Sequence, residues 1–186
     1  MRKLLKFILV IVVCYFIAVI SNIIFLEQIV IYGDSMANNF NNGEFGLADK
    51  QFFKLIKLER FDVVVIEQED SMIIKRVIGL PNEKVEYKDG VLKVNDQVVE
   101  EDFIDESTKL DTNRNNLSIS ITLKNDEYFV LGDNRLVSYD SRNIGPIKYE
   151  NILGRVFVLY GKCENLICDS QGICDCKRKY YWPKFL

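Results

Sequence analysis

The sequence predicts a mostly β protein that is preceded by one membrane-spanning helix. Residues 7–26 form the only long apolar run, interrupted by Ser21 and Asn22 alone. About 20 such residues are enough for a helix to cross the hydrocarbon core of a bilayer. Beyond this run the helical spacing of apolar residues stops. Short β-branched stretches separated by turn-forming residues replace it, which is typical of strands.

The apolar run is interpreted as an uncleaved anchor. A cleaved signal peptide is the alternative, but the run is long for one and no small-x-small cleavage site follows it. Basic residues precede the run within residues 1–6, whereas the first basic residue after it is Lys50. The positive-inside rule therefore predicts a single-pass protein of the cell membrane, with its N-terminus in the cytoplasm and residues 27–186 outside.

Charge and composition exclude several classes of function. Once the three basic residues before the anchor are set aside, 21 Lys and Arg remain against 27 Asp and Glu, a formal charge of -6 on residues 27–186. We expect no nucleic-acid partner, because phosphate binding needs clustered positive charge. The chain also contains no histidine, which excludes Ser-His-Asp catalysis and removes the commonest metal ligand. A hydrolase of this composition must take its base from lysine or the carboxylates.

Six stretches beyond the anchor have the β-branched composition of strands, namely residues 61–66, 71–80, 84–87, 91–94, 128–131 and 152–160. Turn formers at residues 88–90 and 95–96 predict a protruding meander. Residues 104–125 are polar and are expected to form an exposed loop. We therefore interpret residues 83–125 as a smaller β subdomain inserted into a domain of residues 27–162, which residues 163–186 follow as a Cys-rich tail.

A candidate nucleophile lies just beyond the anchor. Residues 33–36 read Gly-Asp-Ser-Met, so Ser35 would act at the outer membrane surface. Serine is a weak nucleophile at its own pKa and needs a neighbouring base. The same four residues also suit an ordinary turn.

Lys75 is the leading candidate for that base. It lies in the apolar stretch of residues 72–78, where strand alternation places Ile73 and Val77 on the same face as the lysine. Such neighbours disfavour the ammonium and lower its pKa, as a general base requires. Asp34 would oppose this if its carboxylate faced the amine. The alternative is a lysine whose amine reaches solvent from a half-buried strand.

A further motif, residues 132–142, links these stretches to a family. Residues 132–142 read Gly-Asp-Asn-Arg-Leu-Val-Ser-Tyr-Asp-Ser-Arg, which alone would suit a polar loop. Together with residues 33–36, residues 60–65 (Arg-Phe-Asp-Val-Val-Val) and residues 75–81 (Lys-Arg-Val-Ile-Gly-Leu-Pro), in this order, the chain resembles the bacterial type I signal peptidases. These are membrane-anchored serine proteases with a Ser/Lys dyad. The resemblance extends to about Tyr160.

The resemblance implies a signal-peptidase-like catalytic domain that removes N-terminal signal peptides from exported preproteins at the outer face of the cytoplasmic membrane. Ser35 would be the nucleophile and neutral Lys75 the general base. Ser138 would orient the lysine amine, while Asp140 and Arg142 would form a supporting ion pair. No cofactor or metal is implied, and the expected partners are preprotein signal peptides and membrane lipid. The residues expected to bind an extended substrate are Met36, Ile73 and Ile74.

The sequence departs from the family at the nucleophile motif. The family usually continues with Met-x-Pro-Thr-Leu, whereas Met36 is followed here by Ala-Asn-Asn-Phe. The stiffening proline is absent, so the presentation of Ser35 depends on Asn38 and Asn39, which tolerate turn dihedrals. Two rival functions remain: a non-catalytic membrane-anchored binding module, which these departures would allow, and another Ser/Lys protease of the same fold.

Four cysteines, Cys163, Cys168, Cys174 and Cys176, lie beyond the resemblance. Outside the cytoplasm they are expected to form disulfides, with three possible pairings. A four-thiolate zinc site is the alternative, although the single residue between Cys174 and Cys176 is a tighter gap than zinc sites usually have. The basic and aromatic residues 177–182 suit contact with anionic lipid headgroups and, equally, a disordered tail.

Overall fold

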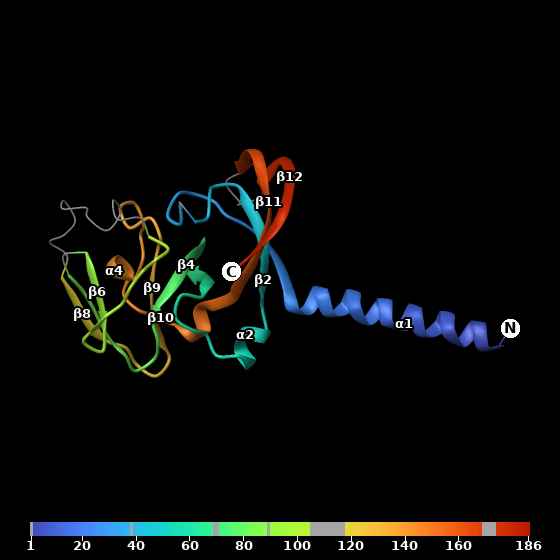
Figure 1. Cartoon of the computed structure of the whole chain (residues 1–186), viewed down its shortest axis with the longest axis horizontal. Coiled ribbons are helices and arrows are strands. Elements are labelled where there is room, and N and C mark those ends of the chain that lie inside the picture. The colour runs from blue at the N-terminus through green and yellow to red at the C-terminus, as the bar shows by residue number, and fades with distance from the viewer. Residues whose placement is uncertain (1, 38, 69–70, 89, 105–117, 169–173) are drawn as a thin grey trace.

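The computed structural model describes residues 2–37, 39–68, 71–88, 90–104, 118–168 and 174–186. Figure 1 shows a β-rich body from which one long helix projects. The helices are α1 (Arg2–Phe25), α2 (Phe52–Leu55) and α4 (Ser141–Ile144), with a 3-10 turn, η1 (Tyr149–Asn151). The strands are β1 (Leu26–Val30), β2 (Glu44–Asp49), β3 (Val63–Gln68), β4 (Ser71–Gly79), β5 (Lys84–Lys88), β6 (Val91–Val94), β7 (Gln97–Val98), β8 (Ile119–Thr122), β9 (Glu127–Leu131), β10 (Ile147–Lys148), β11 (Ile152–Cys168) and β12 (Cys174–Phe185).

The larger sheet contains eight of the described strands. Its order is β1-β2-β11-β3-β4-β9-β10, with β12 paired to β11, and these pairings are antiparallel. The 17-residue β11 is its longest strand. One edge of β11 pairs with β2, and the other edge pairs first with β3 and then with β12. The prediction of a mostly β fold is confirmed.

Strand β3 positions its neighbour β4 at the centre of this sheet. Its first four residues, Val-Val-Val-Ile, are all apolar rather than alternating, which suits a segment covered on both faces. Val63 and Val65 pack into one core cluster with Met36, whereas Val64 and Ile66 pack into another with Val77 of β4. Because this part of β3 is buried on both faces, core packing on either side of the sheet stabilises its pairing with β4.

A second sheet has the order β7-β6-β5-β8. Asn95 and Asp96 both adopt positive φ angles, 50° and 65°, in the two-residue turn from β6 to β7, as tight hairpin turns require. Ile78 of β4 and Phe129 of β9 share a core cluster with residues of this sheet, so the sheet packs on the end of β4 and β9. The expected loop of residues 104–125 contains β8, whose alternation Ile-Ser-Ile-Thr was a usable strand signal. Residues 105–117 of that loop lie outside the described residues.

Helix α1 leads directly into β1, which begins at Leu26, the last residue of the predicted anchor. The carbonyl of Phe25 accepts a hydrogen bond from the backbone N–H of Lys50 (2.9 Å) and so joins the helix end to the sheet. Within the part of the chain that the structure describes, no helix combines the length and apolarity needed to cross a membrane.

The C-terminal region is an extension of the sheet. The second half of β11 pairs with β12, with Lys162 opposite Lys179, so the alternative of a disordered tail is wrong. A disulfide joins Cys163 to Cys176. The expectation of disulfides is thus met for one pair, whereas the side chains of the other two cysteines, Cys168 and Cys174, lie outside the described residues.

Candidate active site

The turn that carries Ser35 lies between β1 and β2. Gly33 has a φ of +89°, which glycine adopts without a steric penalty, and its N–H donates to Asn42 Oδ1 (3.0 Å). Met36 and Phe40, which follow Ser35, are both buried in the core. The turn is thus fixed on both sides of a half-exposed serine.

Lys75 lies in β4 directly beside this turn. Its side chain is 3% exposed, and Nζ lies 2.8 Å from Ser35 Oγ. Nζ also donates a hydrogen bond to the carbonyl of Ile74 (3.0 Å). The two residues that the sequence singled out are therefore in hydrogen-bond contact across 40 positions of the chain.

Burial lowers the pKa of Lys75, because the desolvated ammonium is disfavoured. Two carboxylates, Asp140 and then Asp133, act in the opposite direction. They differ from the one that the sequence pointed to, since Asp34 lies exposed at the rim of the site. Arg142 pairs with Asp140 and Arg76 with Asp133, so each carboxylate close to the amine has its own cation.

Asp140 holds the loop of residues 132–142 in shape. It is fully buried, caps the N-terminus of α4, and accepts hydrogen bonds from Gly132 N (3.0 Å) and Arg142 Nε (2.8 Å). Arg142 Nη2 also donates to the carbonyl of Arg135 (2.8 Å). The ion pair expected between Asp140 and Arg142 is present, and it folds the two ends of the loop together.

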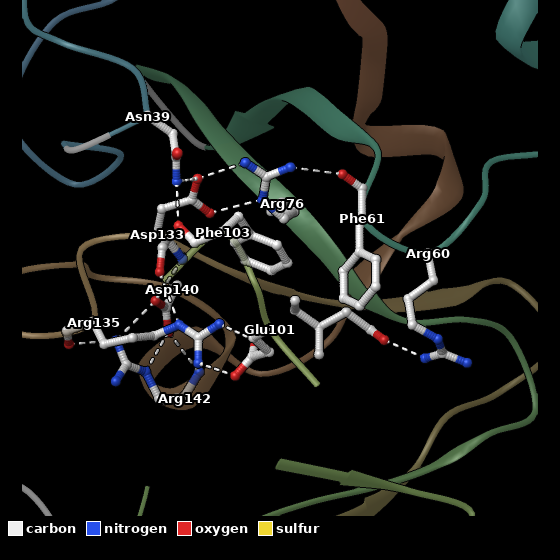
Figure 2. Close-up of polar contacts among 12 residues, drawn as sticks. Asn39, Arg60, Phe61, Arg76, Glu101, Phe103, Asp133, Arg135, Asp140 and Arg142 are labelled. Atoms are coloured by element: carbon white, nitrogen blue, oxygen red, sulfur yellow. Dashed lines mark hydrogen bonds and ion pairs between the residues drawn. The ribbon is translucent and has the colours of Figure 1, made fainter. Parts of the chain in front are cut away.

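A second network, which sequence reasoning missed, joins this loop to the nucleophile turn. Arg76 makes two bonds to Asp133, from Nε (2.8 Å) and Nη2 (2.6 Å), and Asn39 Nδ2 donates to Asp133 Oδ2 (3.0 Å), as Figure 2 shows. The N–H of Asn134 donates to the carbonyl of Ser35 (3.0 Å). Arg76 and Asp133 both lie inside the motifs quoted above. Their place in those motifs was a signal that could have identified them as residues of the site.

Ser138 does not make the contact expected of it. Its Oγ is buried and has no hydrogen-bond partner among the described residues, so the predicted bond to Lys75 is not formed. A Cβ added at Gly132 would lie 2.2 Å from this Oγ and 2.5 Å from the carbonyl oxygen of Ser35. Only glycine allows the loop to approach the nucleophile turn this closely.

A groove of about 640 Å³ opens over the Ser35–Lys75 pair. Ile73 lines it, as expected for a substrate-binding residue. Met36 and Ile74 are not among its lining residues. Met36 is buried beneath it, where its sulfur accepts from Asp133 N (3.4 Å), and Ile74 packs against the same core cluster. The groove is lined by Tyr32, Gly33, Asp34, Ser35, Gln68, Ser71, Ile73, Lys75, Val137 and Tyr139.

Comparison with known proteins shows which family the chain is similar to. Residues 3–161 match the family model described as signal peptidase, peptidase S26. The chain is 35% identical over 144 residues to signal peptidase I V of Bacillus subtilis (strain 168), covering 73% of this chain and 85% of the relative. It is 33% identical over 168 residues to signal peptidase IB of Staphylococcus aureus (strain Mu50), covering 83% and 88%. A crystal structure of a signal peptidase I from Enterococcus faecalis V583 is 33% identical and covers 53% of this chain and 96% of its own, with a TM-score of 0.47.

Proposed function

Because the chain belongs to the signal peptidase family, peptidase S26, we propose that Ser35 and Lys75 are the nucleophile and general base with which it cleaves. The chain is a serine peptidase that removes signal peptides. The observation that carries the proposal is the 2.8 Å contact between Ser35 Oγ and Lys75 Nζ at the floor of a groove. In a chain without histidine, this buried amine is the base within reach of the hydroxyl.

In the proposed mechanism the neutral amine of Lys75 accepts the proton of Ser35 as Oγ attacks the scissile carbonyl. Collapse of the tetrahedral intermediate breaks the peptide bond, and Lys75 returns the proton to the leaving amine. Water then attacks the acyl-enzyme with Lys75 again as base, which releases the acyl group and restores the serine. Burial supports this role, because it favours the neutral amine before substrate binds.

The substrate is proposed to bind as an added strand. In β4, residues 71–75 pair with β3, and pairing with β9 begins only at Arg76. Among the described residues no strand pairs with the other edge of residues 71–75, and apart from the carbonyl of Ile74, which accepts from Lys75 Nζ, its backbone groups are proposed to pair with an extended peptide beside the groove. Ile73 would form an apolar wall for small substrate side chains. Met36 and Ile74 would support that wall from the core beneath.

Ser138, Asp140 and Arg142 are proposed to support the dyad. The Asp140–Arg142 pair is buried and fixes the loop beside Lys75. Ser138 Oγ has no hydrogen-bond partner in the described part of the chain and lies next to Gly132, close to the Ser35 turn. Rotation of the lysine side chain toward it would give the amine a second orienting partner during the reaction.

The enzyme is proposed to be a single-pass protein of the cell membrane, anchored by residues 7–26 with its N-terminus in the cytoplasm. Apolar side chains of α1 are exposed at every position from 7 to 13, and consecutive residues of a helix cover all its faces. Such a surface is suited to lipid rather than water. Protease added to intact spheroplasts should digest residues 27–186, and protection of this region would contradict the topology.

Cleavage of a preprotein by the detergent-solubilised full-length chain tests the activity. The wild type should release the mature protein, whereas Ser35→Ala and Lys75→Ala should each abolish release, and the double variant should be scarcely worse than either single variant because the pair acts as one unit. Exposed Ser120 and Lys124 provide matched controls, Ser120→Ala and Lys124→Ala. A binding module would leave the preprotein uncut, and a Ser35→Ala chain that cleaves at the normal rate would end the dyad proposal.

A further inference from the structure

Residues 101–104 connect the second sheet to the candidate active site. They follow strand β7, and Phe103 packs against the core cluster that this sheet shares with β4 and β9. Glu101 and Ile104 are buried, and the N–H of Ile104 donates to the carbonyl of Glu101 (3.1 Å), which closes a turn. We call residues 101–104 the bridging turn. A buried glutamate is rare unless its charge is paired, so the partner of Glu101 indicates what this turn does.

The partner of Glu101 is Arg135, which lies in the loop of residues 132–142. Nη1 of Arg135 donates to Glu101 Oε2 (3.0 Å) and Nη2 donates to Oε1, so the two planar groups bind side by side (Figure 2). Both side chains are almost completely buried. Apolar side chains of similar size in place of a buried ion pair often leave stability unchanged or raise it. Stability alone is therefore a weak reason for this pair.

Arg135 links Glu101 to the residue at which the loop meets the nucleophile turn. Its Nε donates to the carbonyl of Gly132 (3.0 Å), while the N–H of Gly132 donates to Asp140 (3.0 Å). Side chains thus hold the Gly132 backbone at both its carbonyl and its N–H. This backbone lies so close to Ser35 that a Cβ added at Gly132 would be 2.5 Å from the Ser35 carbonyl oxygen. Because Glu101 occupies both Nη atoms of Arg135, it fixes the direction in which Nε points.

The bridging turn also contacts the nucleophile turn directly. The carbonyl of Phe103 accepts a hydrogen bond from Asn39 Nδ2 (2.6 Å). The centre of the Phe103 ring lies 4.2 Å from Cζ of Arg76, as Figure 2 shows. One short turn of the second sheet therefore reaches both segments that meet at the site.

We propose that Glu101 is a positioning residue for the Ser35–Lys75 pair. It orients Arg135, and Arg135 holds the carbonyl of Gly132, so the loop stays against the nucleophile turn. Glu101 is not among the residues that line the groove, and it therefore acts on the geometry of the reacting atoms rather than on substrate contact. The role rests on the proposed functions of Ser35 and Lys75. The second sheet, which contributes no reacting group, thus helps to place the nucleophile.

Glu101→Gln tests this role, because it keeps the shape of the side chain and removes the charge that holds Arg135. The assay is preprotein cleavage by the detergent-solubilised full-length protein. We expect kcat to fall about tenfold to a hundredfold, which corresponds to the loss of a hydrogen bond to a charged group. KM should change by less than about twofold, because the lining of the groove stays the same.

Glu83→Gln is the matched control. Glu83 pairs with Arg60 (2.6 Å), which also donates to a backbone carbonyl, that of Ile78, near the boundary between the two sheets. Among the described residues, this second pair makes no hydrogen bond or ion pair with the loop of residues 132–142. The control should keep the kcat of the wild type, whatever its effect on the melting temperature.

A double variant separates positioning from stability. Glu101→Leu with Arg135→Met removes both charges, so its melting temperature should return close to that of the wild type, above that of Glu101→Gln. Its kcat should stay low, because the Gly132 carbonyl still lacks its donor. Circular dichroism at the assay temperature gives the folded fraction of each variant, and kcat is compared per folded molecule.

The outcomes distinguish this role from the function on which it rests. Glu101→Gln with the kcat of the wild type, or with a raised KM alone, would overturn the positioning role and leave the peptidase function standing. Recovery of kcat together with the melting temperature in the double variant would make the ion pair purely structural and would overturn the role as well. A Ser35→Ala chain that still cleaves would contradict the dyad and, with it, this role.

Discussion

Asn39 donates a hydrogen bond from its side-chain amide to Asp133 Oδ2 (3.0 Å), and this contact joins the Ser35 turn to the loop of residues 132–142. The same nitrogen also donates to the carbonyl of Phe103 (2.6 Å). Asn39 stands in the segment where the family usually has Pro-Thr. The side chain of Asn39 is hydrogen-bonded to the buried carboxylate of Asp133, which also pairs with Arg76. This bond restricts the conformation of the turn, as the proline would.

Asn39→Ala should therefore lower kcat more than it changes KM, because the Ser35 turn loses its tie while the groove keeps its lining. A hydrogen bond to a charged group contributes about 1.5–3 kcal/mol, so a loss of about ten- to a hundredfold is expected. Asn41→Ala is the control, since Asn41 is exposed and its bond to Glu44 comes from the backbone N–H. Unchanged kcat with a lowered melting temperature would make Asn39 a purely structural residue.

The pH dependence should show the lowered pKa of Lys75. Activity requires the neutral amine, so kcat/KM should rise with pH through that pKa, which burial keeps below the ordinary lysine value of about 10.4. An acidic limb at the ordinary value would identify a solvated lysine and contradict its role as the base.

Lys75→Met should be inactive but at least as stable as the wild type near pH 6. The unfolded chain keeps the lysine proton up to its ordinary pKa, whereas the folded chain releases it at lower pH. Burying the charged amine thus costs folding free energy below the lowered pKa, and the cost fades as pH rises toward the unfolded value. Methionine fills similar space without the amine. Thermal unfolding of both proteins between pH 6 and 10 checks this, and a variant several degrees less stable at pH 6 would count against the buried amine.

Gly132→Ala should displace the nucleophile turn. Its new Cβ would meet Ser138 Oγ and the Ser35 carbonyl at 2.2 and 2.5 Å, and overpacking of this kind costs about 1–3 kcal/mol. We expect most of the activity to be lost. Gly145→Ala is the control, because Gly145 has open space but a φ of +80° and so tests backbone strain without collision. Wild-type activity of Gly132→Ala would show that the close approach at Gly132 is not needed.

The Cys163–Cys176 disulfide should be found by mass spectrometry of the unreduced protein. A crosslink that closes a loop of this size stabilises by about 2–4 kcal/mol, so Cys163→Ala with Cys176→Ala should unfold earlier in denaturant. Cys14→Ala, at a free and exposed cysteine, should not. Four free thiols in the tail with bound zinc would favour the rival zinc site.

The sequence by itself determined the class of fold and singled out the two residues proposed to react. The composition and alternation that indicate a strand involve only neighbouring residues. The stretches that form β3, β4, β5, β6 and β9 could therefore be predicted from β-branched runs and the turns between them. The absence of histidine left lysine as the leading base for Ser35, and the motif at residues 132–142 identified the family. These inferences need only neighbouring residues or composition.

Tertiary structure decided what depends on contacts between distant residues. Asn39 meets Asp133 across 94 positions, and Asp140 and Asp133, rather than the adjacent Asp34, act on the lysine amine. Met36 faces the core instead of the groove. Strand β12 has a basic, aromatic sequence interrupted by Pro183, which gives a weak strand signal, and it is a strand because the edge of β11 supplies its hydrogen bonds. The local sequence pattern determines which residues can form a strand. The pairing energy that stabilises β12 as a strand comes from a partner elsewhere in the chain.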